Sequence, residues 1–177
     1  MNAPAAWFVM PSTTVAAVAR ILIIAGGARG RALAGELIAQ GHAVRITTRG
    51  GAREAIEALG AECWIGTPDR IATLRYALDG VTLACWLLGC VRGEPETLRA
   101  LHGSRLDFFV NQTIDTTVRG LLYEAAGSVD VATLAAGREL ITQKALYNAI
   151  PLAVLDADPS DQAGWLAQAR AAIARLL

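Results

Sequence analysis

The stretch Arg20–Arg49 constrains the fold of this chain more than any other part of its 177 residues. It opens with Ile21–Ile24, and so short an apolar run is typical of a parallel strand that is covered on both faces. After a glycine turn, leucine and isoleucine recur at three- and four-residue steps until Gly41, as they do in a helix. His42–Thr48 then alternates like a second strand. The stretch therefore predicts a strand–helix–strand unit with parallel strands.

The turn between that strand and helix matches the dinucleotide-binding pattern G-x-G-x-x-G except at its first position, which is Ala25. Glycine tolerates the backbone angles of such a turn, and its missing Cβ lets the backbone approach a phosphate group. The N–H groups and the positive dipole end of the following helix then face the bound anion. We therefore expect a dinucleotide to be bound by Gly26, Gly27, Ala28, Arg29 and Gly30.

Two segments resemble a known superfamily. Ala25–Ala32, A-G-G-A-R-G-R-A, resembles the T-G-G-A-R-G-I-G turn of the short-chain dehydrogenase/reductase superfamily, with alanine in place of its Thr and its last Gly. Gly60–Gly89 is similar to the third-strand, helix and fourth-strand segment of the atypical, epimerase-like branch. The resemblance covers residues 20–90 well and the rest of the chain in outline. It implies an NAD(P)-binding Rossmann fold and the function of an NAD(P)-dependent oxidoreductase or epimerase.

The alternation of strands and helices continues along the chain. Further strands are expected at Ala61–Ile65, Val81–Leu88, Gly120–Glu124 and Leu152–Leu155. Helices are expected at Ala52–Leu59, after a cap at Asp69, over Glu94–Thr117 with a weak point at Gly103-Ser104, over Val131–Tyr147, and from Asp158-Pro159-Ser160-Asp161 onward. Strands joined by right-handed crossovers predict an α/β fold, a doubly wound parallel sheet between two helical layers, with six strands in the order 3-2-1-4-5-6.

This strand order predicts where a ligand binds. Ligands bind outside the carboxyl ends of the first and fourth strands, where the order reverses. The glycine turn should meet the end of the fourth strand there, so Leu88 and Gly89 are candidate cofactor contacts. Thr67 and Asp69 follow the third strand and are candidates for the adenine side, although a helix cap explains Asp69 at least as well.

The end of the second strand distinguishes the two nicotinamide cofactors. An NAD site usually has Asp or Glu about twenty residues past the glycine turn. Here the strand ends Thr47-Thr48-Arg49, and the next carboxylate is Glu54. A guanidinium matches the oxygens of the NADP 2′-phosphate, so we predict NADP rather than NAD, bound by Thr48 and Arg49. In the resembling family the position of Arg29 can reach the same phosphate, although either arginine could instead be a solvated surface residue.

The usual catalytic residues of the resembling superfamily are missing from this sequence. Its members use a Tyr and a Lys four residues apart, with a Ser near the end of the fifth strand, and the Tyr is the general acid/base. The single lysine here, Lys144, has Leu140 four residues before it. Tyr123, Glu124 and Ser128 are weak candidates as substitutes, and packing at the strand end or a helix cap explains each of them better.

Two classes of function therefore stay open, and whether the chain is an enzyme is undecided. The first is an NADP-dependent oxidoreductase or epimerase-like enzyme whose acid/base residues are unorthodox or absent. The second is a non-catalytic dinucleotide-binding protein that senses redox state or acts through a partner. Both need the glycine turn, and the lack of an evident substrate domain favours the second.

Composition narrows the expected partners and location. Apolar residues make up 54% of the chain and the formal net charge is zero, so neither nucleic acid nor an anionic membrane is expected as a partner. Residues 1–19 are expected to be a flexible tail, with Met10 as an alternative start, before one NAD(P)-binding domain at residues 20–177. The tail lacks the pattern of a signal peptide, so we expect a cytoplasmic protein. A homodimer is left open.

The cysteines and histidines do not suggest a metal site. Cys63, Cys85 and Cys90 lie in or beside expected strands, and none has a metal-ligand spacing to His42 or His102. We expect reduced, structural thiols and two histidines without a catalytic role.

Overall fold

The computed structural model of the chain describes residues 18–25 and 27–177. Its central strand is β1, Arg20–Ile24, where the sequence predicted a buried strand. Residues Ile21 to Ile24 are completely buried, as a strand between two helical layers requires. β1 pairs in parallel with β2, Ala43–Thr48, on one side and with β4, Leu83–Trp86, on the other. The strand order reverses between β1 and β4.

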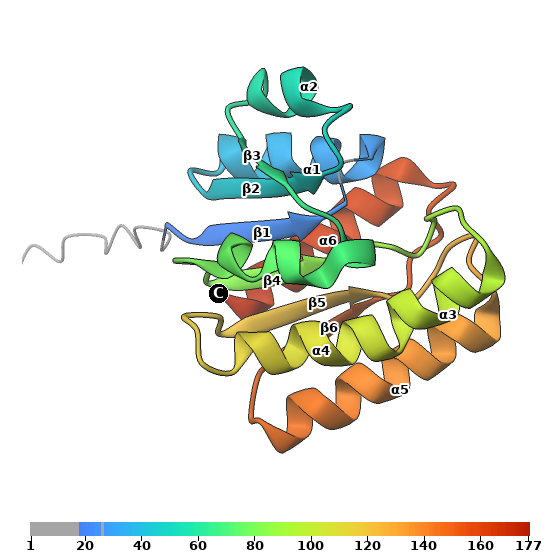
Figure 1. Cartoon of the computed structure of the whole chain (residues 1–177). Helices are drawn as coiled ribbons and strands as arrows, with labels where there is room; N and C mark the ends of the chain where they lie inside the picture. The colour runs from blue at the N-terminus through green and yellow to red at the C-terminus, as the bar shows by residue number, and fades with distance from the viewer. Residues whose placement is uncertain (1–17, 26) are drawn as a thin grey trace, which may run out of the picture.

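The remaining strands extend the sheet on both sides. β3, Glu62–Ile65, pairs with β2; β5, Gly120–Glu124, pairs with β4; and β6, Leu152–Leu155, pairs with β5, all in parallel. The six strands lie in the order β3-β2-β1-β4-β5-β6 (Figure 1). The predicted doubly wound sheet and its strand order are therefore confirmed.

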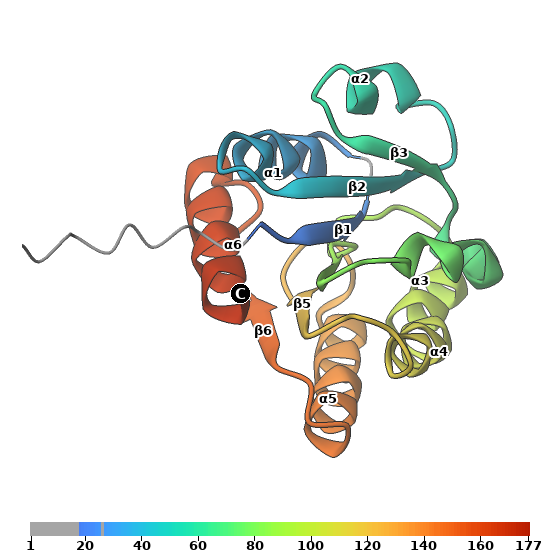
Figure 2. The ribbon, with the colours of Figure 1, turned by 90° about the vertical axis from the view of Figure 1, so that its left-hand side faces the viewer.

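Helices cover both faces of the sheet (Figure 2). On one face lie α1 (Ala28–Ala39), α2 (Arg53–Glu57) and α6 (Gln162–Leu176). On the other face lie α3 (Pro95–His102), α4 (Ser104–Thr113) and α5 (Val131–Tyr147). Successive residues of β1 point to opposite faces, so Ile21 and Ile23 join the first core while Leu22 and Ile24 join the second. The sheet thus has an apolar core on each side.

The segment between β3 and β4 differs from its prediction. A single helix capped by Asp69 was expected, but the chain forms two 3₁₀ segments, η1 (Pro68–Leu74) and η2 (Tyr76–Leu78). Arg70 leaves helical geometry, with φ −122° and ψ 68°. The cap is Thr67, whose hydroxyl oxygen accepts the Asp69 backbone N–H at 3.3 Å. Asp69 is therefore one of the first helical residues and not the cap, because Pro68 occupies the first position of the segment.

Helix boundaries elsewhere follow the capping residues. The expected weak point at Gly103 does divide the helical stretch into α3 and α4, and α4 ends at Thr113, before the expected Thr117. The cap of α5 is Asp130, whose carboxylate accepts the Thr133 N–H at 3.0 Å, and not Ser128. The cap of α6 is Asp161. Pro159 lies before that helix, outside the first turn in which it was expected.

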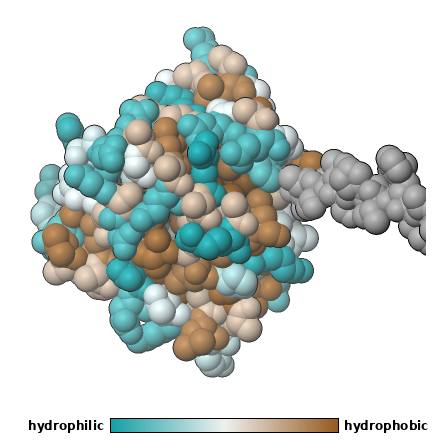
Figure 3. All heavy atoms as spheres, turned by 180° about the vertical axis from the view of Figure 1, so that it is seen from behind, coloured by the Kyte–Doolittle hydropathy of each residue, from teal (hydrophilic) through white to brown (hydrophobic). Residues whose placement is uncertain are grey.

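The surface opposite the view of Figure 1 carries hydrophobic and hydrophilic side chains side by side (Figure 3). Within residues 18–25 and 27–177, no helix has both the length and the hydropathy needed to cross a bilayer. Most of the expected N-terminal tail, residues 1–17, lies outside the described residues.

Candidate functional site

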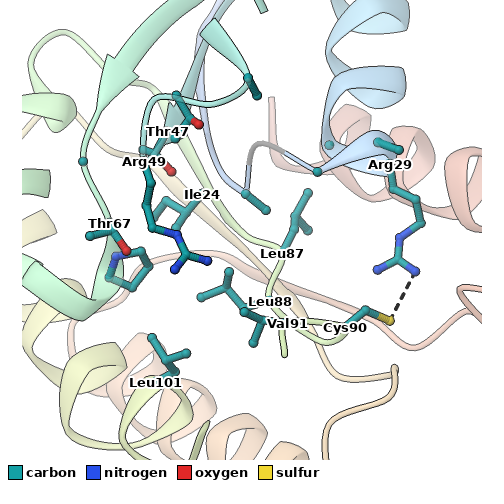
Figure 4. Close-up of a pocket in the computed structure, with 18 of the residues that line it drawn as sticks. Ile24, Arg29, Thr47, Arg49, Thr67, Leu87, Leu88, Cys90, Val91 and Leu101 are labelled. Carbon is teal, nitrogen blue, oxygen red and sulfur yellow. Dashed lines mark hydrogen bonds between the residues drawn. The ribbon is translucent and has the colours of Figure 1, made fainter. Parts of the chain in front are cut away.

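A pocket of about 600 Å³ lies at the carboxyl ends of β1 to β4, around the point where the strand order reverses. Figure 4 shows residues from all four strand ends facing one another across it. The predicted cofactor-binding residues that line it are Gly27, Ala28, Arg29, Gly30, Thr48, Arg49, Thr67 and Leu88. Of the other two, Gly26 lies outside the described residues and Gly89 is buried behind the pocket wall. Eight of the ten candidate cofactor contacts therefore line one pocket, and their binding of a cofactor stays a prediction.

The glycine turn leads directly into α1. Gly27 is the residue before the helix, and the first helical hydrogen bond runs from the Arg31 N–H to the Gly27 carbonyl at 3.0 Å. The N–H groups of Ala28 to Gly30 precede that bond, so they have no carbonyl partner within the helix. Among the described residues, no side chain caps this end and no acidic residue occupies the first turn. The first turn of α1, with the positive end of its dipole, therefore borders the pocket.

Two of the glycines have different steric roles. A Cβ at Gly30 would collide with the carbonyl oxygen of Ala25, so only glycine lets α1 pack this closely on the end of β1. A Cβ at Gly27 would meet no atom within 4 Å, because this residue borders the open pocket. Gly30 is thus needed by the fold, whereas Gly27 leaves room for a ligand.

The end of β2 places a cation at the pocket. Arg49 is exposed and lines the pocket, and its guanidinium reaches in from the β2 side (Figure 4). Within the described part of the chain, Arg49 has no hydrogen-bond or ion-pair partner. Its neighbour Thr48 accepts the Gly50 N–H at 3.2 Å, which holds the loop after β2 in a tight turn. Asp69 also lines the pocket, but the Arg105 guanidinium pairs with its carboxylate at 2.6 Å.

Arg29 lies on the opposite side of the pocket from Arg49, with Leu87 and Leu88 between them (Figure 4). Its guanidinium pairs with the Glu124 carboxylate at 3.1 Å and donates to the Cys90 sulfur at 3.3 Å. It also lies 5.2 Å from the centre of the Trp165 ring, within the range of a cation–π contact. The structure therefore does not bring the two predicted phosphate-binding arginines together, because Glu124 holds Arg29 near β5.

Glu124 is a fully buried carboxylate at the end of β5. Its Oε2 accepts the Gly89 N–H at 2.7 Å, and its Oε1 accepts the Trp165 indole N–H at 2.9 Å in addition to the Arg29 contact. Burial raises the pKa of this carboxyl, while the Gly89 N–H, the Arg29 charge and the Trp165 N–H act in the opposite direction. Gly89 thus serves Glu124 and not the pocket, and both carboxylate oxygens are already engaged.

The other catalytic candidates lie away from the pocket. The Tyr123 hydroxyl contacts the His102 Nδ1 at 2.7 Å in the buried core under α5. Burial raises the pKa of the Tyr123 hydroxyl. Ser128 is exposed and does not line the pocket. Lys144 pairs with Asp107 on α4 at 2.7 Å. These three side chains therefore lie in different parts of the molecule.

Trp165 is one of the lining residues that the sequence did not reveal as part of the site, and it is the one that comes from α6. Its position on the apolar face of α6 predicted only core packing, and its ring is indeed buried. The fold brings α6 beside α1, which places the indole N–H against Glu124. A tryptophan in an otherwise alanine-rich helix was the available signal.

The described residues contain no group of three His, Cys, Asp or Glu side chains placed to hold a metal ion. Cys63, Cys85 and Cys90 are free thiols.

No protein-family model and no curated protein sequence matches this chain. Solved structures do match it. BdcA from E. coli is 14% identical with a TM-score of 0.68, over 86% of this chain and 88% of that one. A short-chain dehydrogenase from Streptomyces avermitilis is 17% identical with a TM-score of 0.62, over 78% and 64%. UDP-glucose 4-epimerase from Thermotoga maritima is 12% identical with a TM-score of 0.64, over 77% and 54%.

The chain shares its fold with the Rossmann proteins of the dehydrogenase and epimerase group. This bears out the structural similarity that the sequence motifs implied. It spans about half the length of some of these proteins, 50% of the protein gox2253 and 54% of the epimerase. At identities of 12–17% the likeness to these named structures concerns the fold, and activity has to be argued from the site.

Proposed function

We propose that the chain is an NADP(H)-binding Rossmann protein. The supporting observation is the charge at the end of β2, where Arg49 enters the pocket and the next carboxylate along the sequence is Glu54, which does not line it. The uncapped first turn of α1 lies in the same pocket and would bind the pyrophosphate. Thr48 would contact the 2′-phosphate, and Thr67 and Leu88 would border the adenosine half.

The distribution of charge favours Arg49 over Arg29 as the group that recognises the 2′-phosphate. Arg29 is neutralised by Glu124 at 3.1 Å, whereas Arg49 carries an uncompensated charge among the described residues. A 2′-phosphate carries up to about two negative charges, and each charged hydrogen bond to it contributes roughly 1.5–3 kcal/mol. One or two such bonds therefore predict a preference for NADPH over NADH.

The site supports binding better than it supports chemistry. The fold is shared with reductases and epimerases, which makes an oxidoreductase or epimerase the first candidate for an activity. Neither Tyr123 nor Ser128 lines the pocket, and both oxygens of Glu124 are taken by other donors. This observation favours the second candidate, a dinucleotide-binding protein that acts as a redox sensor or regulator.

The test of this proposal is the variant Arg49→Glu, compared with wild type by calorimetric titration with NADPH and NADH. The substitution removes the attraction for the 2′-phosphate and adds repulsion, so the preference for NADPH should narrow at least about tenfold or reverse. The wild-type preference should also shrink with added salt, because the arginine is exposed and its charge is screened.

The matched control is Arg138→Glu, which makes the same charge change on the exposed side of α5 and does not line the pocket. This variant should keep the wild-type ratio. If the wild-type chain binds NADPH and NADH equally well, and if neither variant changes this ratio, Arg49 does not recognise a 2′-phosphate.

A further inference from the structure

The pocket is asymmetric across the point where the strand order reverses. Its lining comes from the ends of β1, β2, β3 and β4, together with Leu101 and Trp165. Among the described residues, none that follows β5 or β6 takes part in it, apart from Trp165 on α6. A dinucleotide bound at a switch point has its second nucleotide on the far side of the glycine turn from the adenosine, here the side of β4 and β5. The lining of the pocket thus stops short of the ends of β5 and β6.

Arg29 lies across the place where the pocket stops. From the first turn of α1 its guanidinium reaches Glu124 at the end of β5, the Cys90 sulfur after β4, and the Pro159 carbonyl oxygen before α6 at 3.5 Å. The Trp165 ring lies against the same guanidinium. One side chain thus connects α1 to the loop after β4, to the end of β5 and to the loop before α6, and it lies between the pocket and the end of β5.

The surroundings of Arg29 keep it in this place. Glu124 has no exposed surface, so moving the guanidinium away would leave a buried carboxylate without its counter-charge. The loops after β4 and β5 also pack closely against each other. A Cβ on Gly89 would collide with the Ala126 carbonyl oxygen, and a Cβ on Gly127 would collide with the Gly89 carbonyl oxygen. The Val129 N–H donates to the Gly89 carbonyl at 3.0 Å and fastens the two loops together.

From these contacts we infer that the pocket recognises only the adenosine half of the cofactor, the adenosine 2′,5′-bisphosphate group. The Arg29–Glu124 pair closes off the place of the second nucleoside. This inference rests on the proposed NADP(H) site and specifies which part of the ligand is bound. The nicotinamide ring of a bound NADP molecule then projects into solvent. A nicotinamide ring in solvent undergoes no reaction at the pocket, which explains why the weak catalytic candidates do not meet there.

The test compares adenosine 2′,5′-bisphosphate with NADP⁺ as ligands of the full chain. Because the nicotinamide nucleoside makes no contacts beyond the pyrophosphate, the two dissociation constants should agree within about threefold. Saturation-transfer NMR of bound NADP⁺ should show strong transfer to the adenine protons and little to the nicotinamide protons. NADP⁺ binding more than about tenfold tighter than the bisphosphate, with strong transfer to the nicotinamide, would overturn the inference.

The double variant Arg29→Ala/Glu124→Gln opens the closed end without leaving a buried charge. The amide oxygen that this change introduces on β5 can still accept from the Gly89 N–H or the Trp165 N–H. In this variant NADP⁺ should gain affinity relative to the bisphosphate, and its nicotinamide protons should receive saturation. The control Arg53→Ala/Glu57→Gln removes an exposed ion pair on α2 and should leave the ratio unchanged. The same ratio in the open variant as in wild type would contradict the role of Arg29.

The outcomes separate this inference from the proposed function. If neither ligand binds, the NADP(H) site and the inference both fall. If both ligands bind and NADPH binds more tightly than NADH, but the nicotinamide protons receive saturation in wild type, the NADP(H) site stands and only the closure by Arg29 falls.

Discussion

At the scale of single residues, the glycine turn combines two requirements that the sequence pattern does not separate. Gly30 has no room for a Cβ against the Ala25 carbonyl, while Gly27 borders open space. The first position serves the packing of α1 on β1, and the second leaves the pocket accessible. Glycine therefore serves the packing of the fold at Gly30 and leaves space at the pocket at Gly27.

This difference predicts unequal effects of two alanine substitutions. Gly30→Ala should lower the free energy of unfolding by about 1–3 kcal/mol, because the added methyl group forces α1 away from β1. Gly27→Ala, which is the matched control, should change it by less than about 0.5 kcal/mol. Urea denaturation followed by circular dichroism measures both values. Equal effects of the two substitutions would show that the packing of α1 does not depend on Gly30.

The sequence indicated which residues would line the pocket where the signal was local, but it did not indicate the contact between Arg29 and Glu124. Gly27, Arg49 and Thr67 follow strands, and a strand end can be recognised from the apolar run before it. The partners Arg29 and Glu124 are 95 positions apart. No periodicity connects them, because their contact depends on where α1 and β5 lie in the sheet. The buried carboxylate was for that reason considered only as a weak catalytic candidate.

At the scale of elements, the strands were predicted well because each is an apolar run that ends near glycine or a polar residue. Helix ends were less certain, because several polar residues compete to cap them. Ser128 and Asp130 both precede α5, and the carboxylate of Asp130 is the one that accepts the Thr133 N–H. Between β3 and β4, Thr67 caps in place of Asp69, and the segment becomes 3₁₀.

A buried pair joins α3, β5 and α5. The His102 Nδ1 contacts the Tyr123 hydroxyl at 2.7 Å, and that hydroxyl lies 3.3 Å from the Leu134 carbonyl oxygen of α5. Burial lowers the pKa of His102 below its ordinary value of 6.5, although the backbone of Leu88 acts in the opposite direction. The histidine is therefore neutral in the folded protein at a pH where the unfolded chain takes up a proton.

This pKa shift predicts how stability depends on pH. Because the folded pKa is the lower one, the contribution of His102 is present above pH 6.5 and is lost as the pH falls below it. The loss for one group amounts to at most about 1.4 kcal/mol per pH unit. Urea unfolding at several pH values between 5 and 8, in roughly half-unit steps, should show a flatter decline for His102→Gln than for wild type. Parallel curves for the two proteins would mean that His102 does not cause the decline.

At the scale of the whole molecule, the strand order sets the location of the pocket. The reversal between β1 and β4 opens a crevice at the carboxyl edge, and the sequence predicted this from the order of its elements alone. The extent of the pocket could not be predicted in the same way. It depends on the side chains of Arg29, Glu124 and Trp165, which three distant elements bring together.

The central claim is that this pocket binds NADP(H) through Arg49, and calorimetric titration of the wild-type chain with NADPH and NADH tests it most directly. One or two charged hydrogen bonds to the 2′-phosphate, at roughly 1.5–3 kcal/mol each, predict that NADPH binds about ten- to a hundredfold more tightly than NADH. Equal affinities for the two cofactors, or no binding of either, would contradict the claim.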